Sequence, residues 1–141
     1  NKISRKIQQY TIFLIIHQEK ILLKKRPSQG LLAGLWEYPN LEGILNATEA
    51  RFFLQDKGVA VDTITPVGSA KHTFTHIQWQ MNGYLVKISK PLPLFGGTWI
   101  SYQALKENYA LPNAYQFYTA LLDQLFAPKD KQLTIFDYQN E

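Results

Sequence analysis

The apolar run at positions 12–16 constrains the fold of this chain more than any other stretch. Isoleucine, phenylalanine and leucine follow one another there without a polar interruption. The run closes a β-rich segment over residues 8–16 that predicts a central strand. A polar turn at residues 17–20 separates it from residues 21–26, which predict an antiparallel partner strand. Because the run is far too short to cross a bilayer, no membrane partner is expected.

Three more segments have strand character. Residues 63–70 and 77–88 predict two strands, and residues 98–100 predict a short third one. From Ile77 to Met81, apolar residues alternate with glutamines. This alternation is typical of a strand that buries one face and leaves the other in water.

Helix signals are equally local. Asn46 predicts an N-cap and Glu49 completes a capping box three residues later. Gly58 predicts the C-terminal stop of that helix. Ser101 predicts the cap of a short helix that runs through Glu107.

A longer amphipathic helix is predicted over residues 113–126. Its apolar residues recur at helical spacing: Ala114, Phe117, Leu121 and Leu125. Strands and helices are therefore mixed along the chain, without the regular alternation of a doubly wound parallel sheet. The pattern predicts an α+β fold in which helices pack against a mixed β-sheet.

A length of 141 residues suffices for one domain with a hydrophobic core. We expect residues 1–7 to be the end of an interdomain linker and residues 8–127 to form the domain. Residues 128–141 are expected to be a C-terminal tail. Cysteine is absent from the sequence, which excludes disulfides, thiolate metal sites and a cysteine nucleophile, and which fits a cytoplasmic protein.

The positive charge gathers at the amino-terminal end. The whole chain carries a net charge of +4, but residues 1–26 carry +6 and residues 27–141 carry −2. The cations of this basic segment are Lys2, Arg5, Lys6, Lys20, Lys24, Lys25 and Arg26. Two interpretations stay open: contact with a polyanion such as nucleic acid, or a solvated basic face without a partner.

Residues 72–76 are the strongest candidate for a functional segment. The sequence there is His-Thr-Phe-Thr-His, directly before the alternating strand. Aromatic rings stack on nucleobases, and hydroxyls form hydrogen bonds with a base edge at close range. A short loop of this composition suits the inspection of one base in DNA, although the same residues also serve as ordinary packing and turn residues.

The segment from Gly34 to Pro39, Gly-Leu-Trp-Glu-Tyr-Pro, followed by a helix that ends near Gly58, resembles the Nudix fold. The resemblance implies a Nudix-like mixed β-sheet packed with helices. It also implies a magnesium site, because Nudix hydrolases hold the metal with glutamates on this helix. Asn40 and Leu41 stand where the family has two glycines.

The helix itself departs from the Nudix pattern as well. Phe52 stands where the first glutamate is expected, and Gln55 and Asp56 stand where an adjacent glutamate pair is expected. Since Mg²⁺ needs several carboxylate oxygens close together, these substitutions predict a domain that has kept the fold and lost the hydrolase activity. We therefore expect neither a metal nor another cofactor in this chain.

Nearly the whole chain resembles the C-terminal domain of MutY-type adenine DNA glycosylases. The resemblance rests on Gly-Leu-Leu-Ala-Gly-Leu-Trp-Glu-Tyr-Pro at 30–39, residues 72–76, Trp79 and the Leu-Pro at 111–112. It implies recognition of 8-oxoguanine opposite adenine in double-stranded DNA, within a bacterial cytoplasm. Catalysis and an iron–sulfur cluster belong to the N-terminal catalytic domain of such enzymes. That domain is the expected partner, and the chain itself is expected not to be an enzyme.

The lesion-reading triplet of that family is Phe-Ser-His, which falls on Phe74, Thr75 and His76. Threonine keeps the serine hydroxyl and adds a methyl group that restricts its rotamers. Thr75 is expected to accept a hydrogen bond from N7–H of 8-oxoguanine and to donate toward O8. His72 is expected to fix the turn or to contact DNA.

Lys71 and Arg26 are the remaining candidates for DNA contact, through phosphate groups. Two alternative functions also stay open. One is a divergent Nudix nucleotide hydrolase whose carboxylates come from Glu37, Glu42 or Glu49. The other is a protein-interaction module.

Overall fold

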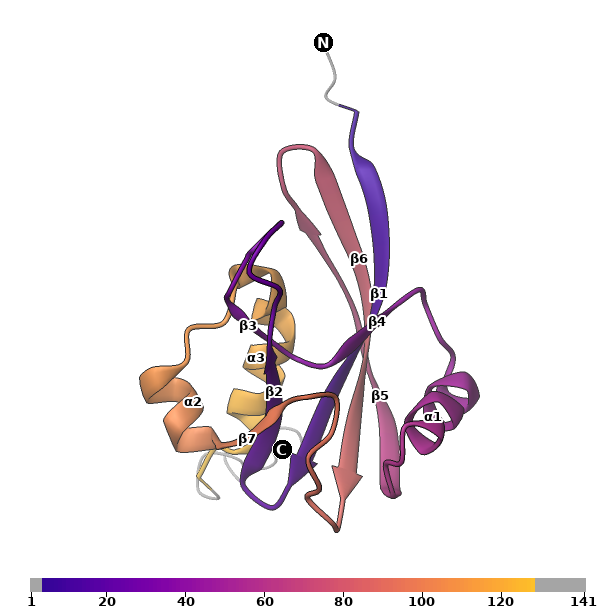
Figure 1. Cartoon of the computed structure of the whole chain (residues 1–141), viewed down its shortest axis with the longest axis vertical. Helices are drawn as coiled ribbons and strands as arrows, with labels where there is room; N and C mark the ends of the chain where they lie inside the picture. Colours follow the sequence, from indigo (N-terminus) through magenta and orange to yellow (C-terminus); the bar gives the residue numbers. More distant parts are fainter. Residues whose placement is uncertain (1–3, 129–141) are drawn as a thin grey trace, which may run out of the picture.

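A computed structural model describes residues 4–128 of the chain (Figure 1). Its elements, in chain order, are β1 (Lys6–His17), β2 (Lys20–Lys25), β3 (Trp36–Glu37), β4 (Asn40–Glu42), α1 (Ala47–Asp56), β5 (Val61–Thr73), β6 (Ile77–Ile88), β7 (Thr98–Ser101), α2 (Tyr102–Asn108), the 3₁₀ turn η1 (Asn113–Tyr115) and α3 (Gln116–Leu125). The predicted mixture of strands and helices is confirmed.

β1 is the central strand, as predicted. Along one edge it pairs in parallel with β6, from Lys6 opposite Ile77 to Ile16 opposite Lys87. Along its other edge it pairs antiparallel with β4 and, near the hairpin, with β2. The strand order is β3-β2-β1-β6-β5, with β4 added to β1 and β7 added to β2. Parallel and antiparallel pairs therefore occur in one mixed sheet.

Both faces of β1 are covered, which explains its uninterrupted apolar run. Ile12, Leu14 and Ile16 belong to the core beneath α2 and α3. Phe13 and Ile15 belong to a second core beneath α1. Figure 1 shows α1 on one side of the sheet and α2 and α3 on the other. A parallel pair such as β1–β6 is normally buried on both faces, and the two cores satisfy that requirement over the lower part of the sheet.

The helix starts follow the sequence signals closely. The Asn46 side chain accepts a hydrogen bond from the Glu49 amide at 2.9 Å, and the Glu49 carboxylate accepts one from the Asn46 amide at 3.0 Å. Gly58 has φ = +86° just beyond the helix, a conformation that favours glycine. The Ser101 hydroxyl caps α2 by accepting from the Ala104 amide.

The prediction for the last helix is wrong in two respects. The segment begins as η1 and only then becomes α3. Its buried residues are Ala114, Tyr115, Tyr118 and Leu122. Phe117, which was expected on the core face, is 42% exposed. Tyr118 faces the sheet in place of Phe117, because Gly83 of β6 leaves room for the Tyr118 ring.

Other predicted bounds differ by a few residues. β1 begins at Lys6, inside the segment expected to be linker. β5 extends from Val61 to Thr73 and is longer than predicted, with register irregularities at Val61/Thr63 and Pro66/Gly68. The expected tail lies outside the described residues beyond position 128. Among the described residues no helix is long and apolar enough to cross a membrane.

Two glycines, Gly68 and Gly83, lie where α3 packs closely against the sheet. Gly68 of β5 lies opposite Gly83 of β6, and the Phe117 ring lies against Gly68 while the Tyr118 ring lies against Gly83. The Tyr118 hydroxyl donates to the Gly68 carbonyl at 3.1 Å. A Cβ atom added at Gly83 would lie 2.2 Å from Cε1 of Tyr118, closer than any real van der Waals contact. The missing side chain at Gly83 therefore lets the helix approach the sheet.

We predict that Gly83→Ala lowers the free energy of unfolding by about 1–3 kcal/mol, because the added methyl group forces the Tyr118 ring out of its place. Urea unfolding of the purified chain measures this. In a double-mutant cycle, the effect of Gly83→Ala should largely disappear in a Tyr118→Ala background. Strict additivity of the two substitutions would contradict the proposed contact.

Candidate nucleic-acid interface

The segment from Phe74 to His76 forms the turn between β5 and β6, and we call it the β5–β6 turn. Thr73 and Gln78 are the last strand pair before it, and the Phe74 amide donates to the Ile77 carbonyl at 2.7 Å. The half-buried Phe74 ring packs edge-on against Trp79, with centroids 5.1 Å apart. The same ring contacts His72 at 4.8 Å. Phe74 and His72 therefore support the turn from one side of the hairpin.

The start of β1 fixes the turn from a second direction. The Arg5 Nε donates to the Phe74 carbonyl at 3.0 Å, and the Lys6 amide donates to the His76 carbonyl at 2.9 Å. The Lys6 bond extends the parallel β1–β6 pairing by one backbone contact, and the Arg5 bond adds a side-chain contact to the turn itself. The sequence does not reveal this role of Arg5 and Lys6, because it depends on a parallel pairing across about seventy positions.

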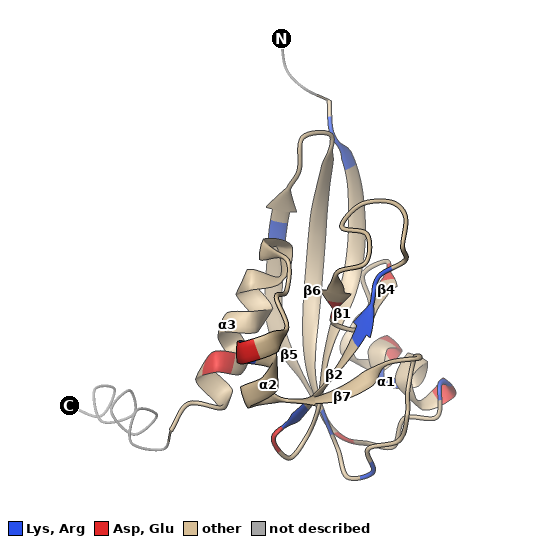
Figure 2. Ribbon diagram, turned by 60° about the vertical axis from the view of Figure 1, so that its left-hand side comes forward, with Lys and Arg blue, Asp and Glu red and all other residues tan. Residues whose placement is uncertain are grey.

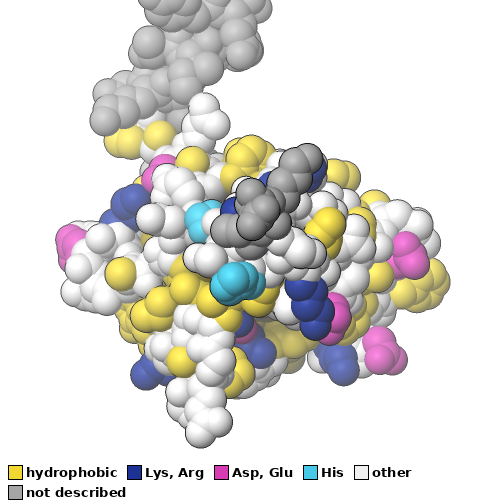
Figure 3. Space-filling view, turned by 90° about the horizontal axis from the view of Figure 1, so that it is seen from above, with side chains coloured by type: hydrophobic (Ala, Val, Ile, Leu, Met, Phe, Trp, Pro, Cys, Tyr) yellow, Lys and Arg dark blue, Asp and Glu magenta, His cyan; other side chains and the backbone are white. Residues whose placement is uncertain are grey.

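Thr75 and His76 project from this fixed turn into solvent. Both residues are exposed, and within residues 4–128 neither side chain has a hydrogen-bond partner in the protein. The Thr75 hydroxyl is thus free both to donate and to accept. Figure 3, which looks onto this end of the sheet, shows histidine side chains at the surface beside lysine and arginine side chains. A free hydroxyl on a braced turn is suited to contact a nucleobase.

The exposed cations near the turn are Arg5, Lys6 and Lys71. Figure 2 shows basic positions near the turn-bearing ends of β1 and β5, and acidic positions on α2 and α3, near β4 and around α1. Asp123 of α3 is itself paired with Lys106 at 3.0 Å. The end of the sheet that carries the turn is therefore the more basic one, and it attracts polyanions.

Arg26 is placed differently from the other predicted phosphate contacts. Its Nη1 lies 2.7 Å from Oε2 of Glu37, with side-chain exposures of only 18% and 6%. Its Nε donates to the Leu31 carbonyl at 3.1 Å, and its guanidinium lies 5.3 Å from the centre of the Trp79 ring. Arg26 thus has an internal partner for its charge, and it supports the ring on which Phe74 packs.

Tyr115 completes this buried cluster. Its hydroxyl donates to the Glu37 carboxylate at 3.3 Å. Burial and, next, the negative charge of Glu37 raise the pKa of the Tyr115 phenol above its usual value. The phenol therefore stays protonated at neutral pH and remains a donor. We call Arg26, Glu37 and Tyr115 the Arg26–Glu37 cluster.

The residues on α1 do not fit a magnesium site. Phe52 is 68% exposed, and the exposed Gln55 and Asp56 leave one carboxylate at the three positions where the Nudix pattern needs glutamates. Of the other carboxylates considered, Glu49 is used in the capping box and Glu37 is paired with Arg26. Among the described residues no group of three or more metal-binding side chains comes together.

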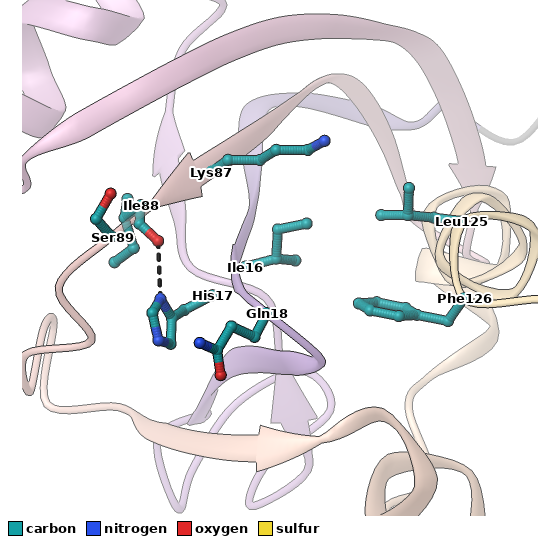
Figure 4. Close-up of a pocket in the computed structure, with 8 residues that line it drawn as sticks. All are labelled: Ile16, His17, Gln18, Lys87, Ile88, Ser89, Leu125 and Phe126. Atoms are coloured by element: carbon teal, nitrogen blue, oxygen red, sulfur yellow. Dashed lines mark hydrogen bonds between the residues drawn. The ribbon is translucent and has the colours of Figure 1, made fainter.

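A hollow of about 590 Å³ opens at the opposite end of the sheet (Figure 4). Ile16, Ile88, Leu125 and Phe126 contribute apolar walls, and the Nδ1 of His17 lies 2.9 Å from the Ile88 carbonyl. The hollow is far along the strands from the β5–β6 turn. His17 is the one imidazole among the residues that line the hollow, and it is already hydrogen-bonded to the Ile88 carbonyl. The lining therefore does not combine a nucleophile with a free general base.

The NUDIX domain family matches residues 11–120 of the sequence. This chain belongs to the NUDIX domain family. The match runs from within β1 to the middle of α3, and it includes the β5–β6 turn and the Arg26–Glu37 cluster.

Solved structures show the same NUDIX fold. The C-terminal domain of mouse MUTYH, in complex with human PCNA, is similar with a TM-score of 0.62 and 19% identity over 86% of this chain and 99% of that one. A MutT chain from a study of Aliivibrio salmonicida and Vibrio cholerae is similar with a TM-score of 0.62 and 21% identity, over 86% of this chain and 100% of that one. The MutT protein of Methanosarcina mazei Go1 is similar with a TM-score of 0.59 and 16% identity, over 90% of this chain and 100% of that one.

We predict that Glu37→Gln lowers the free energy of unfolding of this NUDIX domain by about 3 kcal/mol, because it leaves the Arg26 charge largely buried without its counter-ion. Thermal and urea unfolding measure the loss. Glu19→Gln is the matched control, since Glu19 is exposed in the β1–β2 turn and should change stability by less than about 0.5 kcal/mol. Equal effects of the two substitutions would contradict the structural role of the cluster.

Proposed function

We propose that this chain is the lesion-recognition domain of a MutY-type adenine DNA glycosylase and reads 8-oxoguanine opposite adenine in double-stranded DNA. The observation that carries the proposal is the braced β5–β6 turn, which presents the exposed Thr75 hydroxyl at the basic end of the domain. The likeness to the MUTYH C-terminal domain gives additional support.

The chemistry of the lesion suits this hydroxyl. Oxidation at C8 converts N7 of guanine from an acceptor into an N–H donor and adds the O8 carbonyl. Thr75 accepts from N7–H through its hydroxyl oxygen and donates toward O8. With normal guanine the hydroxyl oxygen faces the N7 lone pair. A polar group denied its hydrogen bond in a closed interface costs about 1–3 kcal/mol, which corresponds to roughly ten- to a hundred-fold discrimination.

The neighbours of Thr75 hold it in place for this contact. Phe74 anchors the turn on Trp79, while Arg5 and Lys6 hold the carbonyls on either side of Thr75. A turn held in its binding conformation loses less entropy on association than a free loop. His76 is exposed beside Thr75 and lies within reach of the base or its backbone.

Excision of adenine itself belongs, in this proposal, to an N-terminal catalytic domain with an iron–sulfur cluster. This chain contributes recognition, and it acts in the bacterial cytoplasm on the nucleoid. A domain that binds DNA weakly by itself gains affinity when it is linked to a second DNA-binding domain, because the linkage raises its effective concentration at the DNA. Lesion preference is therefore best measured both on the isolated chain and on the natural protein in which it occurs.

We predict that Thr75→Val reduces the preference for 8-oxoguanine over guanine about ten-fold or more, because valine keeps the shape and removes the hydroxyl. The measurement compares affinities for two duplexes of one sequence that carry 8-oxoguanine or guanine opposite adenine. Thr65→Val is the matched control, since Thr65 is an exposed residue at the other end of β5. A preference that survives Thr75→Val unchanged would exclude the hydroxyl mechanism.

The alternative of nucleotide hydrolysis has less support, although MutT proteins share the fold. The positions of the Nudix glutamates on α1 carry Phe52, Gln55 and Asp56, and the described residues form no metal-binding group. Turnover of nucleoside triphosphates by the purified chain in the presence of magnesium would overturn the proposal of a non-catalytic domain.

A second candidate function, docking on a partner protein, is favoured by a specific observation. The similar MUTYH domain was solved in complex with human PCNA. In this chain the residues after Pro128, which lie outside the described part, include Gln132, Leu133, Ile135 and Phe136. A short segment with closely spaced apolar side chains suits docking into apolar pockets of a partner. We therefore propose residues 132–136 as the docking segment for a PCNA-like protein.

We predict that the double substitution Leu133→Ala/Phe136→Ala abolishes measurable binding of the chain to the PCNA-like protein of its own organism. Calorimetry measures the binding. Gln139→Ala/Asn140→Ala, in the same tail, is the matched control and should bind as the original chain does. Equal affinities for both double variants would contradict the assignment of this segment.

A further inference from the structure

One face of the sheet next to the β5–β6 turn is polar and open. Successive side chains of a strand point to opposite faces, and the strand register brings Gln9, Gln78, Gln80, Lys71 and Thr73 to the same face. Gln80 lies opposite Gln9 on one side and Lys71 on the other, and Gln78 lies opposite Thr73. We call this set the amide face. It lies on the side of the sheet opposite to Trp79 and α3.

The glutamine side chains of the amide face are linked to one another. Gln9 Nε2 donates to Gln80 Oε1 at 3.3 Å, and Gln80 Nε2 donates to Gln78 Oε1 at 3.1 Å. Gln78 Nε2 in turn donates to the Thr73 hydroxyl at 3.3 Å. Each amide nitrogen has a second N–H, which leaves a row of oriented donors available to an acceptor above the sheet.

No described helix or strand covers the amide face. α1 packs on the lower part of the same side, where Phe13 and Tyr84 lie in its core. In Figure 1, β1, β6 and β5 continue well beyond α1 toward the turn. A parallel pair such as β1–β6 is normally buried on both sides, so an uncovered stretch of it is a candidate contact surface.

We infer that the sugar–phosphate backbone of the DNA lies along the amide face, an inference that rests on the proposed function of the β5–β6 turn. The face offers hydrogen-bond donors and the Lys71 cation, which are the groups that phosphate oxygens need. Two shallow hollows follow it and share Gln9 and Gln80. Glu42 lines one of them together with Lys6, so its negative charge lies beside a positive one.

The composition of the surface argues against an apolar protein partner. The exposed Ile7, opposite Gln78, adds one apolar side chain to this face, and Ile44 lines one of its hollows. The other side chains of the face are polar or charged, whereas the core of a stable protein interface is rich in apolar and aromatic residues. The dimensions also fit a nucleic-acid strand. From Thr73 to Ser69 the β5 strand rises by about 13 Å, at about 3.3 Å per residue. This length is close to the axial rise of about four nucleotides in one strand of DNA.

The first test is an NMR titration of the ¹⁵N-labelled chain with a duplex that contains 8-oxoguanine opposite adenine. Side-chain NH₂ signals of Gln9, Gln78 and Gln80 report the face directly, even when binding is weak. We expect these signals to shift together with the backbone amides of residues 69–73. Shifts at the β5–β6 turn that spare the three glutamines would place the duplex elsewhere and overturn the inference.

The second test is salt dependence. Lys71→Gln should lower the slope of log K against log salt by about 0.9, the value for one lost phosphate contact. Lys87→Gln, an exposed lysine near the far end of β6, is the matched control and should leave the slope unchanged. Equal slopes for the two variants would overturn the inference.

The same titrations separate this inference from the proposed function. Glutamine shifts with both duplexes, together with equal affinities for damaged and undamaged DNA, support the backbone contact and count against lesion reading by Thr75. Glutamine signals already displaced in the natural protein without DNA would show that another part of that protein covers the face, and they would overturn the inference.

Discussion

The parallel pairing of β1 with β6 is the constraint on which the rest of the structure depends. It joins the amino-terminal end of the chain to a strand that begins seventy-one positions later. Because the paired strands are apolar on both sides over their lower part, helices must cover both faces there. α1 covers one face of this pair, while α2 and α3 cover the other. The upper part of the pair carries shorter apolar stretches, and it supports the turn and the amide face instead.

Local signals in the sequence predicted local structure well. The bounds of β6, the capping box at Asn46 and the cap at Ser101 are all as the sequence indicated. The buried face of α3 was predicted wrongly, because it depends on the fit between Tyr118 and Gly83. That fit joins residues far apart in the chain, and no periodicity within the helix contains it.

Charge was the least informative sequence signal at the level of single residues. The basic amino-terminal segment includes both Arg5, which braces the turn, and Arg26, which is paired internally with Glu37. A net charge cannot distinguish these two arginines, because their partners are set by tertiary contacts. The placement of Thr75 at an exposed hairpin end, by contrast, follows from two strand predictions that flank a polar segment. Its proposed function comes from the family resemblance and from the free hydroxyl, not from the fold alone.

The two hydrogen bonds from Arg5 and Lys6 also have a mechanical consequence. The Lys6 backbone bond ends on the His76 carbonyl just ahead of the β1–β6 ladder, and the Arg5 side-chain bond ends on the Phe74 carbonyl. The position of the β5–β6 turn is therefore coupled to the position of residues 5 and 6, so a shift of the start of β1 also shifts the carbonyls that flank Thr75.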